Sequence, residues 1–252
     1  MAHAARFRRV CIGMALMAIW VLPTNGAGLA VAAVFTNPGI PSHCTMEIRD
    51  RLDARRGYVK AVVTVSRRQD SNGPYYAVTS REGDDYANEM RLNYGDLTSA
   101  FEKRTDLRSG SVIELYERID NNHVHFVNRE KKIDRLFSTR DSNIYTRFAY
   151  FLSFSGFPFG TKADVSFKTY MSEYGDTLTM RLRNLGRTRV TVPAGSFDCY
   201  KLELSVGGWQ AMFARDRFYL YFDAAMPHHF VRYDEKDGDR WYSNELISYT
   251  EE

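Results

Sequence analysis

Two pairs of histidines are the residues in this chain that could most simply bind a metal ion. His123 and His125 flank Val124 in an alternating segment, so both imidazoles would lie on one face of a β-strand. An ordinary exposed strand face is the alternative interpretation, and no third ligand follows at a suitable spacing. His228 and His229 are adjacent and would point to opposite faces of a strand. The sequence therefore predicts no metal site.

Hydroxyl and acidic residues in the C-terminal half also lack a catalytic arrangement. Ser196 stands in AGSFD, which lacks the flanking glycines and following helix of a nucleophile elbow. Asp234–Asp239 (DEKDGD) lacks the alternating ligands and distal glutamate of a calcium loop, and its Asp-Gly pair is typical of a hairpin turn. No glycine-rich loop opens a helix, so no cofactor is predicted. We expect a protein without catalytic activity, with a cofactor-free enzyme using His228 and Asp234 as an alternative.

An aromatic segment is the best candidate for a binding site. Its stretch IYTRFAYFLSF carries a single charged residue. Five side chains of this stretch, together with Phe157 just after it, could line a site for a lipid or another apolar ligand: Tyr145, Phe148, Phe151, Leu152, Phe154 and Phe157. The core of a β-sheet protein uses the same residue types. Core packing and ligand binding both remain open for this set.

The same segment has the periodicity of a helix. Its apolar positions fall at i, i+4, i+7 and i+8: Ile144, Phe148, Phe151 and Leu152. Asp141-Ser142 would cap the first turn, and Gly156 and Pro158 would end the helix, which is predicted over residues 142–155. A helix this apolar must be covered on more than one side. In a sheet protein, the inside of the curved sheet provides that cover.

Most of the remaining chain alternates between apolar and polar residues with the period of a β-strand. The clearest stretch is Arg187–Asp234, predicted to form four strands with a Pro-Ala-Gly turn at 193–195. Other strands are predicted over residues 46–52, 59–65, 75–80, 86–93, 112–119, 123–128, 165–171, 177–183 and 240–250. Such short strands predict a mainly β fold with an antiparallel sheet or barrel. No linker or repeat divides the chain, so one domain is expected over 34–252.

The N-terminal segment has the layout of a secretory signal peptide. Three arginines precede an apolar stretch of thirteen residues (Val10–Leu22), and small residues follow at 30–33. An uncleaved anchor helix is the alternative, but thirteen residues span only about 20 Å of the ~30 Å hydrocarbon core. We therefore expect a signal peptide at 1–33, a periplasmic location and no transmembrane helix in the mature form.

Removing that segment also removes the net positive charge. The chain has 34 basic and 31 acidic residues, and three of the arginines lie in the first 33 residues, which contain no acid. The balance that remains gives no support to nucleic-acid binding.

Two cysteines, Cys44 and Cys199, lie beyond the signal peptide. In an exported protein two thiols most simply form one disulfide, so we expect a bridge between them. Free thiols, or a lipid-modified Cys44, are the alternatives, although Pro41-Ser42-His43 lacks the small residues that lipid processing needs. Alternation places Cys199 with Lys201 and Glu203, so the bridge is expected on the outer face of the sheet.

Several stretches together resemble an uncharacterised family of exported bacterial proteins, domain-of-unknown-function family 3108. They are DSNIYTRFAYFLSF (141–154), VTVPAGSFDCYKLEL (190–204), RFYLYFDAAMPHHFVRYD (217–234) and the final strand. The resemblance covers most of the chain from Thr45 to Tyr249. It implies a half-barrel, a strongly curved antiparallel sheet wrapped over one aromatic helix. Related half-barrels carry lipoproteins across the periplasm, so the resemblance implies an apolar concave face. It brings no catalytic residues.

Two functions without catalysis fit these features. The first is a soluble periplasmic module that binds a lipid or another apolar small molecule in the concave face. The second is a structural envelope protein whose helix plugs the concavity. Its outer face, with Arg215, Arg217, Tyr219 and Tyr221, would contact a protein partner in the envelope.

Overall fold

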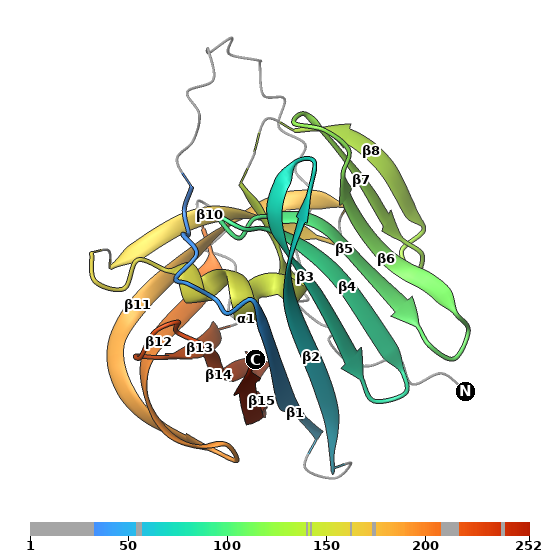
Figure 1. Cartoon of the computed structure of the whole chain (residues 1–252). Helices are drawn as coiled ribbons and strands as arrows, with labels where there is room; N and C mark the ends of the chain where they lie inside the picture. The colour runs from blue at the N-terminus through green and yellow to red at the C-terminus, as the bar shows by residue number, and fades with distance from the viewer. Residues whose placement is uncertain are drawn as a thin grey trace.

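The computed structural model describes residues 33–53, 57–139, 141, 143–161, 163–172, 175–207, 217–237 and 240–252. Residues 1–32 of the predicted signal peptide lie outside these ranges. The described chain folds into strands and one short helical segment (Figure 1). The strands are β1 (His43–Asp53), β2 (Gly57–Asp70), β3 (Gly73–Glu82), β4 (Tyr86–Asn93), β5 (Ser99–Asp106), β6 (Ser111–Arg118), β7 (His123–Asn128), β8 (Ile133–Ser138), β9 (Ile144–Thr146), β10 (Asp164–Met171), β11 (Asp176–Val192), β12 (Gly195–Val206), β13 (Arg217–Asp223), β14 (Phe230–Asp237) and β15 (Arg240–Glu251).

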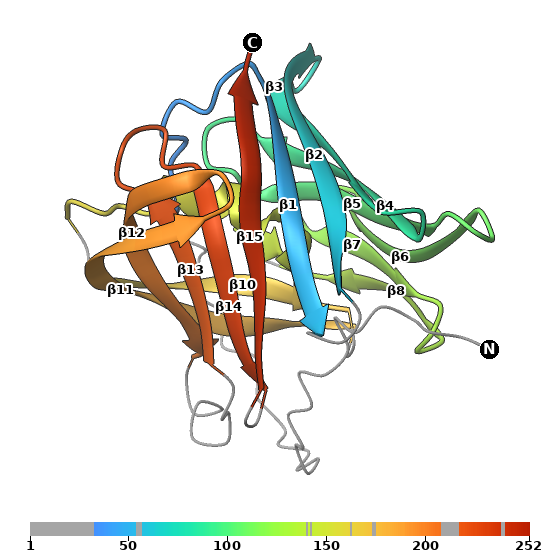
Figure 2. The ribbon, with the colours of Figure 1, turned by 90° about the horizontal axis from the view of Figure 1, so that it is seen from below.

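All these strands belong to one sheet, in the order β8-β7-β6-β5-β4-β3-β2-β1-β15-β14-β13-β12-β11-β10-β9. Neighbouring strands are antiparallel except β9 and β10, which run parallel. β1 pairs with β15 near the middle of the sheet, so the first and last strands lie side by side (Figure 2). The sheet curves strongly around the helical segment and does not close into a barrel. The predicted mainly β half-barrel wrapped over one helix is confirmed.

The C-terminal strands follow the predicted hairpins closely. The Pro-Ala-Gly turn joins β11 to β12 through the pair Val192 and Gly195. The stretches predicted over 177–183 and 188–192 form one continuous strand, β11, with a register shift between Asn184 and Arg187. A β-bulge of this kind lets a long strand bend without ending.

The helical segment starts later than the periodicity predicts. It consists of η1 (Arg147–Ala149), α1 (Tyr150–Ser153) and η2 (Phe154–Gly156), while Ser142 lies outside the described residues. The first predicted turn is instead β9, because its backbone pairs with β10. The Thr146 backbone N–H also donates to Ser99 Oγ at 2.9 Å. Hydrogen bonds to other strands therefore replace the first helical turn.

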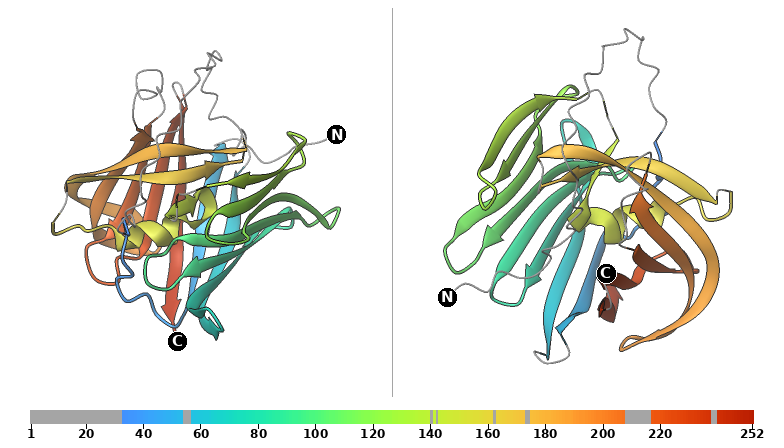
Figure 3. Two further views of the ribbon diagram at one scale, coloured as in Figure 1. Left: turned by 90° about the horizontal axis from the view of Figure 1, so that it is seen from above. Right: turned by 180° about the vertical axis from the view of Figure 1, so that it is seen from behind.

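The two ends of the sheet pack against each other. Tyr170 of β10 stacks on Phe126 of β7, with ring centroids 3.5 Å apart, and contacts Tyr116 of β6. Asn128 Nδ2 donates to the Ser172 carbonyl at 3.2 Å. These contacts bring β9 and β10 across the sheet toward β5–β7, as Figure 3 shows. The helical segment lies inside the resulting curve.

The N-terminal segment of the described chain closes the core over this helix. Phe35 is fully buried and contacts the rings of Tyr145, Phe154 and Phe167. The Thr36 N–H donates to the Gly156 carbonyl at 3.1 Å. A Cβ added to Gly156 would lie 2.4 Å from the Thr36 carbonyl oxygen, so glycine is needed for this close approach.

Candidate functional site

The six predicted apolar site residues separate into two groups in the structure. Four are buried within the hydrophobic core: Tyr145, Leu152, Phe154 and Phe157. Phe148 and Phe151 pack against that core but keep part of their surface exposed. A ligand at the helix could therefore reach Phe148 and Phe151 without rearranging the core, whereas the other four act as packing residues.

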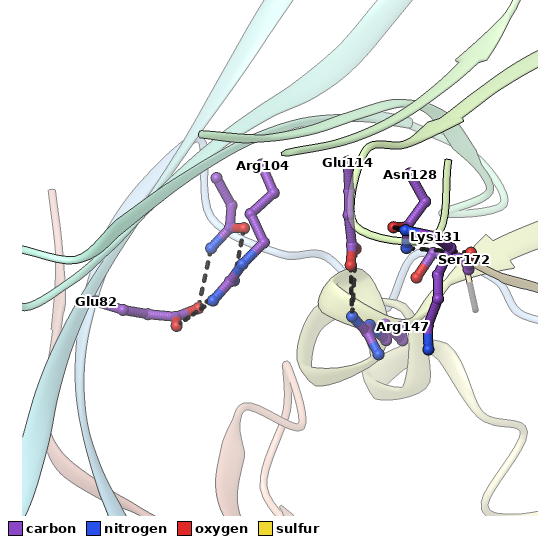
Figure 4. A network of polar contacts seen from close by, with 8 residues as sticks. Glu82, Arg104, Glu114, Asn128, Lys131, Arg147 and Ser172 are labelled. Atoms are coloured by element: carbon purple, nitrogen blue, oxygen red, sulfur yellow. Dashed lines mark hydrogen bonds and ion pairs between the residues drawn. The ribbon is translucent and has the colours of Figure 1, made fainter. Parts of the chain in front are cut away.

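Phe148 lies beside a buried ion pair. Arg104 of β5 donates to both carboxylate oxygens of Glu82 at 2.8 Å and to Asn88 Oδ1 at 3.0 Å (Figure 4). The Arg104 guanidinium also lies over the Tyr86 and Phe148 rings, 4.2 and 4.8 Å from their centroids. The Arg104 guanidinium is thus fixed by an ion pair, by a hydrogen bond to an amide oxygen and by cation–π contacts with two aromatic rings.

A second ion pair joins the helical segment to the sheet. Arg147 of η1 donates to both oxygens of Glu114 on β6 at 3.2 Å (Figure 4). Its guanidinium lies 4.7 Å from the centroid of the Phe148 ring. Phe148 is therefore placed between two arginines, each paired with its own glutamate.

Glu102 of β5 is a third carboxyl in this charged cluster, which we define as Glu82, Glu102, Arg104, Glu114 and Arg147. Its side chain contacts Thr146 and lies near Glu114 and both arginines. Burial, with Glu114 adding to it, raises the pKa of Glu102 to about 7. This carboxyl is therefore close to half protonated at neutral pH.

Further acids follow the charged cluster along the inside of the sheet. Burial raises the pKa of Asp50 on β1 to about 7, and the neighbouring charges of Glu82 and Glu235 add to the effect. Glu235 of β14 accepts a hydrogen bond from the Tyr233 hydroxyl at 3.1 Å. The inside of the half-barrel is thus apolar around the helix and acidic beyond Phe148.

The sequence pattern did not predict the charged cluster, because it did not predict β5. SAFEKRTD (Ser99–Asp106) has polar residues at nearly every position, so neither face reads as apolar. The structure turns Glu102 and Arg104 inward as a pair of alternate residues on one strand. The only sequence signal for β5 was the run of charged residues of both signs between the strands predicted over 86–93 and 112–119.

The predicted Cys44–Cys199 disulfide is wrong for this structure, in which both residues are free, buried thiols. Strands β15, β14 and β13 separate β1 from β12, a path of roughly 19 Å at ~4.8 Å per strand. A disulfide needs Cα atoms within about 7 Å. The outer-face placement of Cys199 is also wrong. In β12 the buried positions alternate at Leu202, Leu204 and Val206, but the preceding one is Cys199 and not residue 200. This change of phase lies opposite the bulge in β11 and turns Cys199 into the core.

Both thiols are expected to resist alkylation in the folded protein. Burial raises the pKa of Cys44 to about 11 and that of Cys199 to about 12, so the reactive thiolate is scarce at pH 8. Iodoacetamide labelling followed by peptide mass spectrometry should modify both residues only after denaturation. A cross-linked Cys44–Cys199 peptide without reductant would contradict the free-thiol structure.

His123 and His125 have ordinary acidic partners, and His228 Nδ1 lies 2.9 Å from the Asp223 carbonyl oxygen. His123 Nδ1 lies 2.9 Å from Asp120 Oδ2, and His125 Nε2 lies 2.9 Å from Asp134 Oδ1. Within the described ranges, no group of three or more His, Cys, Asp or Glu residues could hold a metal ion. No helix among the described residues is long and apolar enough to cross a membrane.

Comparison with known proteins places this architecture in a family. A family model described as a protein of unknown function, DUF3108, matches residues 59–240. The chain belongs to the DUF3108 family. The match extends from β2 to the start of β15, so the helical segment and the charged cluster lie inside the family domain. Curated proteins give no match.

Three solved structures are similar to this chain at low identity. A beta-barrel-like protein of the DUF1849 family from Brucella abortus is 5% identical, with a TM-score of 0.47, over 86% of this chain and 98% of that one. A lipoprotein candidate from Parabacteroides distasonis is 12% identical, with a TM-score of 0.34, over 87% and 100%. A candidate exported protein with a YmcC-like fold from Bacteroides fragilis is 12% identical, with a TM-score of 0.31, over 86% and 100%.

Proposed function

We propose that this DUF3108 protein is a non-catalytic module of the bacterial envelope that binds a lipid or another apolar ligand inside the half-barrel. The observation that carries the proposal is the partial exposure of Phe148 and Phe151 beside a fully packed aromatic core. Phe148 offers apolar surface next to charged residues, and Phe151 follows three positions later on the same helical segment. An amphipathic molecule matches that boundary better than a wholly apolar or wholly polar one.

An exported location is part of this proposal. It is supported by the basic and apolar N-terminal segment, which has the order of a signal peptide. Fractionation of cells producing the full chain, with mass spectrometry of its mature N-terminus, tests this part. A cytoplasmic protein that still begins at Met1 would contradict it.

A structural protein with a plugged concavity is the second candidate. Tyr145 and Phe154 are completely buried, which favours a helix that fills the sheet rather than one that borders an open site. The outer face offers a surface for a partner, because Trp241 is exposed and stacks on Tyr219. Arg215 and the side chain of Arg217 lie outside the described residues.

A double substitution separates these two functions. Phe148→Ala with Phe151→Ala should weaken binding of the neutral probe N-phenyl-1-naphthylamine about tenfold, because two half-buried rings contribute about 1 kcal/mol or less each. Trp241→Ala, on the outer face, is the matched control and should leave the affinity unchanged. Lipid extraction of protein purified from its own envelope provides the native ligand. If neither probe nor lipid binds the unaltered protein, the plugged structural protein is the better description.

A further inference from the structure

One oxygen of Glu102 has no hydrogen-bond partner among the residues that the structure describes. The Glu102 side chain contacts Thr146, yet Oε2 is buried and unpaired. The residue as a whole is 7% exposed. Buried carboxylate oxygens almost always have a donor, so an unpaired one calls for an explanation. A ligand that brings a donor to this oxygen would supply one.

The neighbouring arginines are held by other carboxylates. Arg104 uses two nitrogens on Glu82 and Asn88, and Arg147 uses one on both oxygens of Glu114. The bonds to Glu82 and Glu114 are charge-assisted, and each arginine is paired with its own glutamate. With three carboxyls against two guanidiniums, the charged cluster has an excess of negative charge when Glu102 is ionised.

The charged cluster is close to solvent although Glu102 is buried. The side chains of Glu82, Glu114 and Arg147 are 21%, 20% and 22% exposed. Phe148, between the two arginines, also keeps part of its surface exposed. Solvent, and with it a small head group, therefore reaches the residues that surround the Glu102 carboxyl.

We propose that the charged cluster binds the primary ammonium group of an amphipathic ligand, with Glu102 Oε2 accepting one of its N–H bonds and Phe148 and Phe151 contacting its apolar chain. This inference rests on the proposed function and adds the chemical class of the ligand. An ammonium has three donors and a positive charge, which match an unpaired acceptor and an acidic surround. An anionic head group would leave Glu102 Oε2 without a donor and would meet a cluster with more carboxyls than guanidiniums.

Proton release provides a second signature of this binding mode. The titratable groups that face Glu102 are Glu114 and Tyr116 on β6, Arg104 on β5 and Arg147 on η1. With the Glu102 pKa raised to about 7, a nearby ammonium would favour its ionised form. Binding at pH 7 should release about half a proton, and a neutral head group should release none.

The test compares four probes by isothermal titration calorimetry at pH 7. They are decylamine and decanoate below their micelle concentrations, decanol below its solubility limit, and propylamine as an ammonium without a long chain. Decylamine should bind about tenfold more tightly than decanol, because a charge-assisted hydrogen bond contributes that much. Titration in buffers of different ionisation enthalpy reports the proton released.

Two variants decide whether Glu102 is responsible. Glu102→Gln should remove the preference for decylamine and the proton release while retaining decanol binding. Glu89→Gln, at an exposed carboxyl on β4 paired with Lys103, is the control and should retain both. Equal affinities for decylamine and decanol, tighter binding of decanoate, or an unchanged preference in Glu102→Gln would overturn this inference and leave apolar binding intact.

The remaining outcomes separate the two proposals. Binding of propylamine as tight as that of decylamine, lost in Glu102→Gln, would support the ammonium site and contradict the apolar ligand. If none of the four probes binds, both proposals fail.

Discussion

The unaltered protein is expected to lose about 2 kcal/mol more stability than its Glu102→Gln variant when the pH rises from 5 to 8. Burial raises the pKa of Glu102 to about 7, above its ordinary value of 4.5. Between pH 4.5 and pH 7 the Glu102 carboxyl is mostly protonated in the folded state and mostly ionised in the unfolded state. Stability therefore falls as the pH rises through this window, and the loss is nearly complete at about pH 8, one unit above the folded-state pKa.

Urea denaturation at pH 5 and pH 8 measures this difference. Thermal unfolding would show the same difference: for a domain of this size, about 2 kcal/mol corresponds to a change of about 4–8 °C in Tm. Because glutamine retains the shape of glutamate and does not titrate, the comparison of two pH values isolates the ionisation. Glu89→Gln, at an exposed carboxyl, should follow the unaltered protein. If Glu102→Gln follows it too, Glu102 has an ordinary pKa in the folded state.

The strands that the sequence predicted are those with one apolar and one polar face. Arg187–Asp234 forms its hairpins because Val190, Leu202 and Leu204 recur with period two and a Pro-Ala-Gly turn separates them. Period two on a half-buried strand is set by local geometry, so sequence alone contains it. This local signal was enough for the fold class.

The features that the sequence did not predict depend on contacts between distant residues. β9 is a strand because Ile144–Thr146 pairs with β10, although its own periodicity is helical. Cys199 turns inward because a bulge on the neighbouring strand shifts its phase. The charged cluster gathers residues from β3, β5, β6 and η1, which no spacing along the chain connects.

The ion pair between Arg104 and Glu82 is expected to be the most sensitive part of the charged cluster. Arg104→Ala should lower the free energy of unfolding by about 3–5 kcal/mol, because it leaves Glu82 charged and without its partner in a half-buried position. Arg104 is 6% exposed at its side chain, and its removal also empties the space between Tyr86 and Phe148. Urea denaturation at pH 7 measures the loss.

Arg108→Ala is the matched control for this substitution. Arg108 pairs with Asp85, but its side chain is 72% exposed, so the loss should stay below about 1 kcal/mol. Similar losses for Arg104→Ala and Arg108→Ala would mean that Arg104 is not held as the structure shows.

A double variant distinguishes a role of the Arg104–Glu82 ion pair in ligand binding from a role in packing alone. Arg104→Met with Glu82→Met removes both charges and keeps apolar volume against Phe148, so most of the stability lost in Arg104→Ala should return. Calorimetric titration with decylamine should show weaker binding in the same folded variant, because the loss of Arg104 removes a positive charge that lowers the pKa of Glu102 and so favours its ionised form. A double variant that is stable but does not bind decylamine would mean that the Arg104–Glu82 pair serves ligand binding. A double variant that binds decylamine as tightly as the unaltered protein would mean that the pair serves only the packing against Phe148.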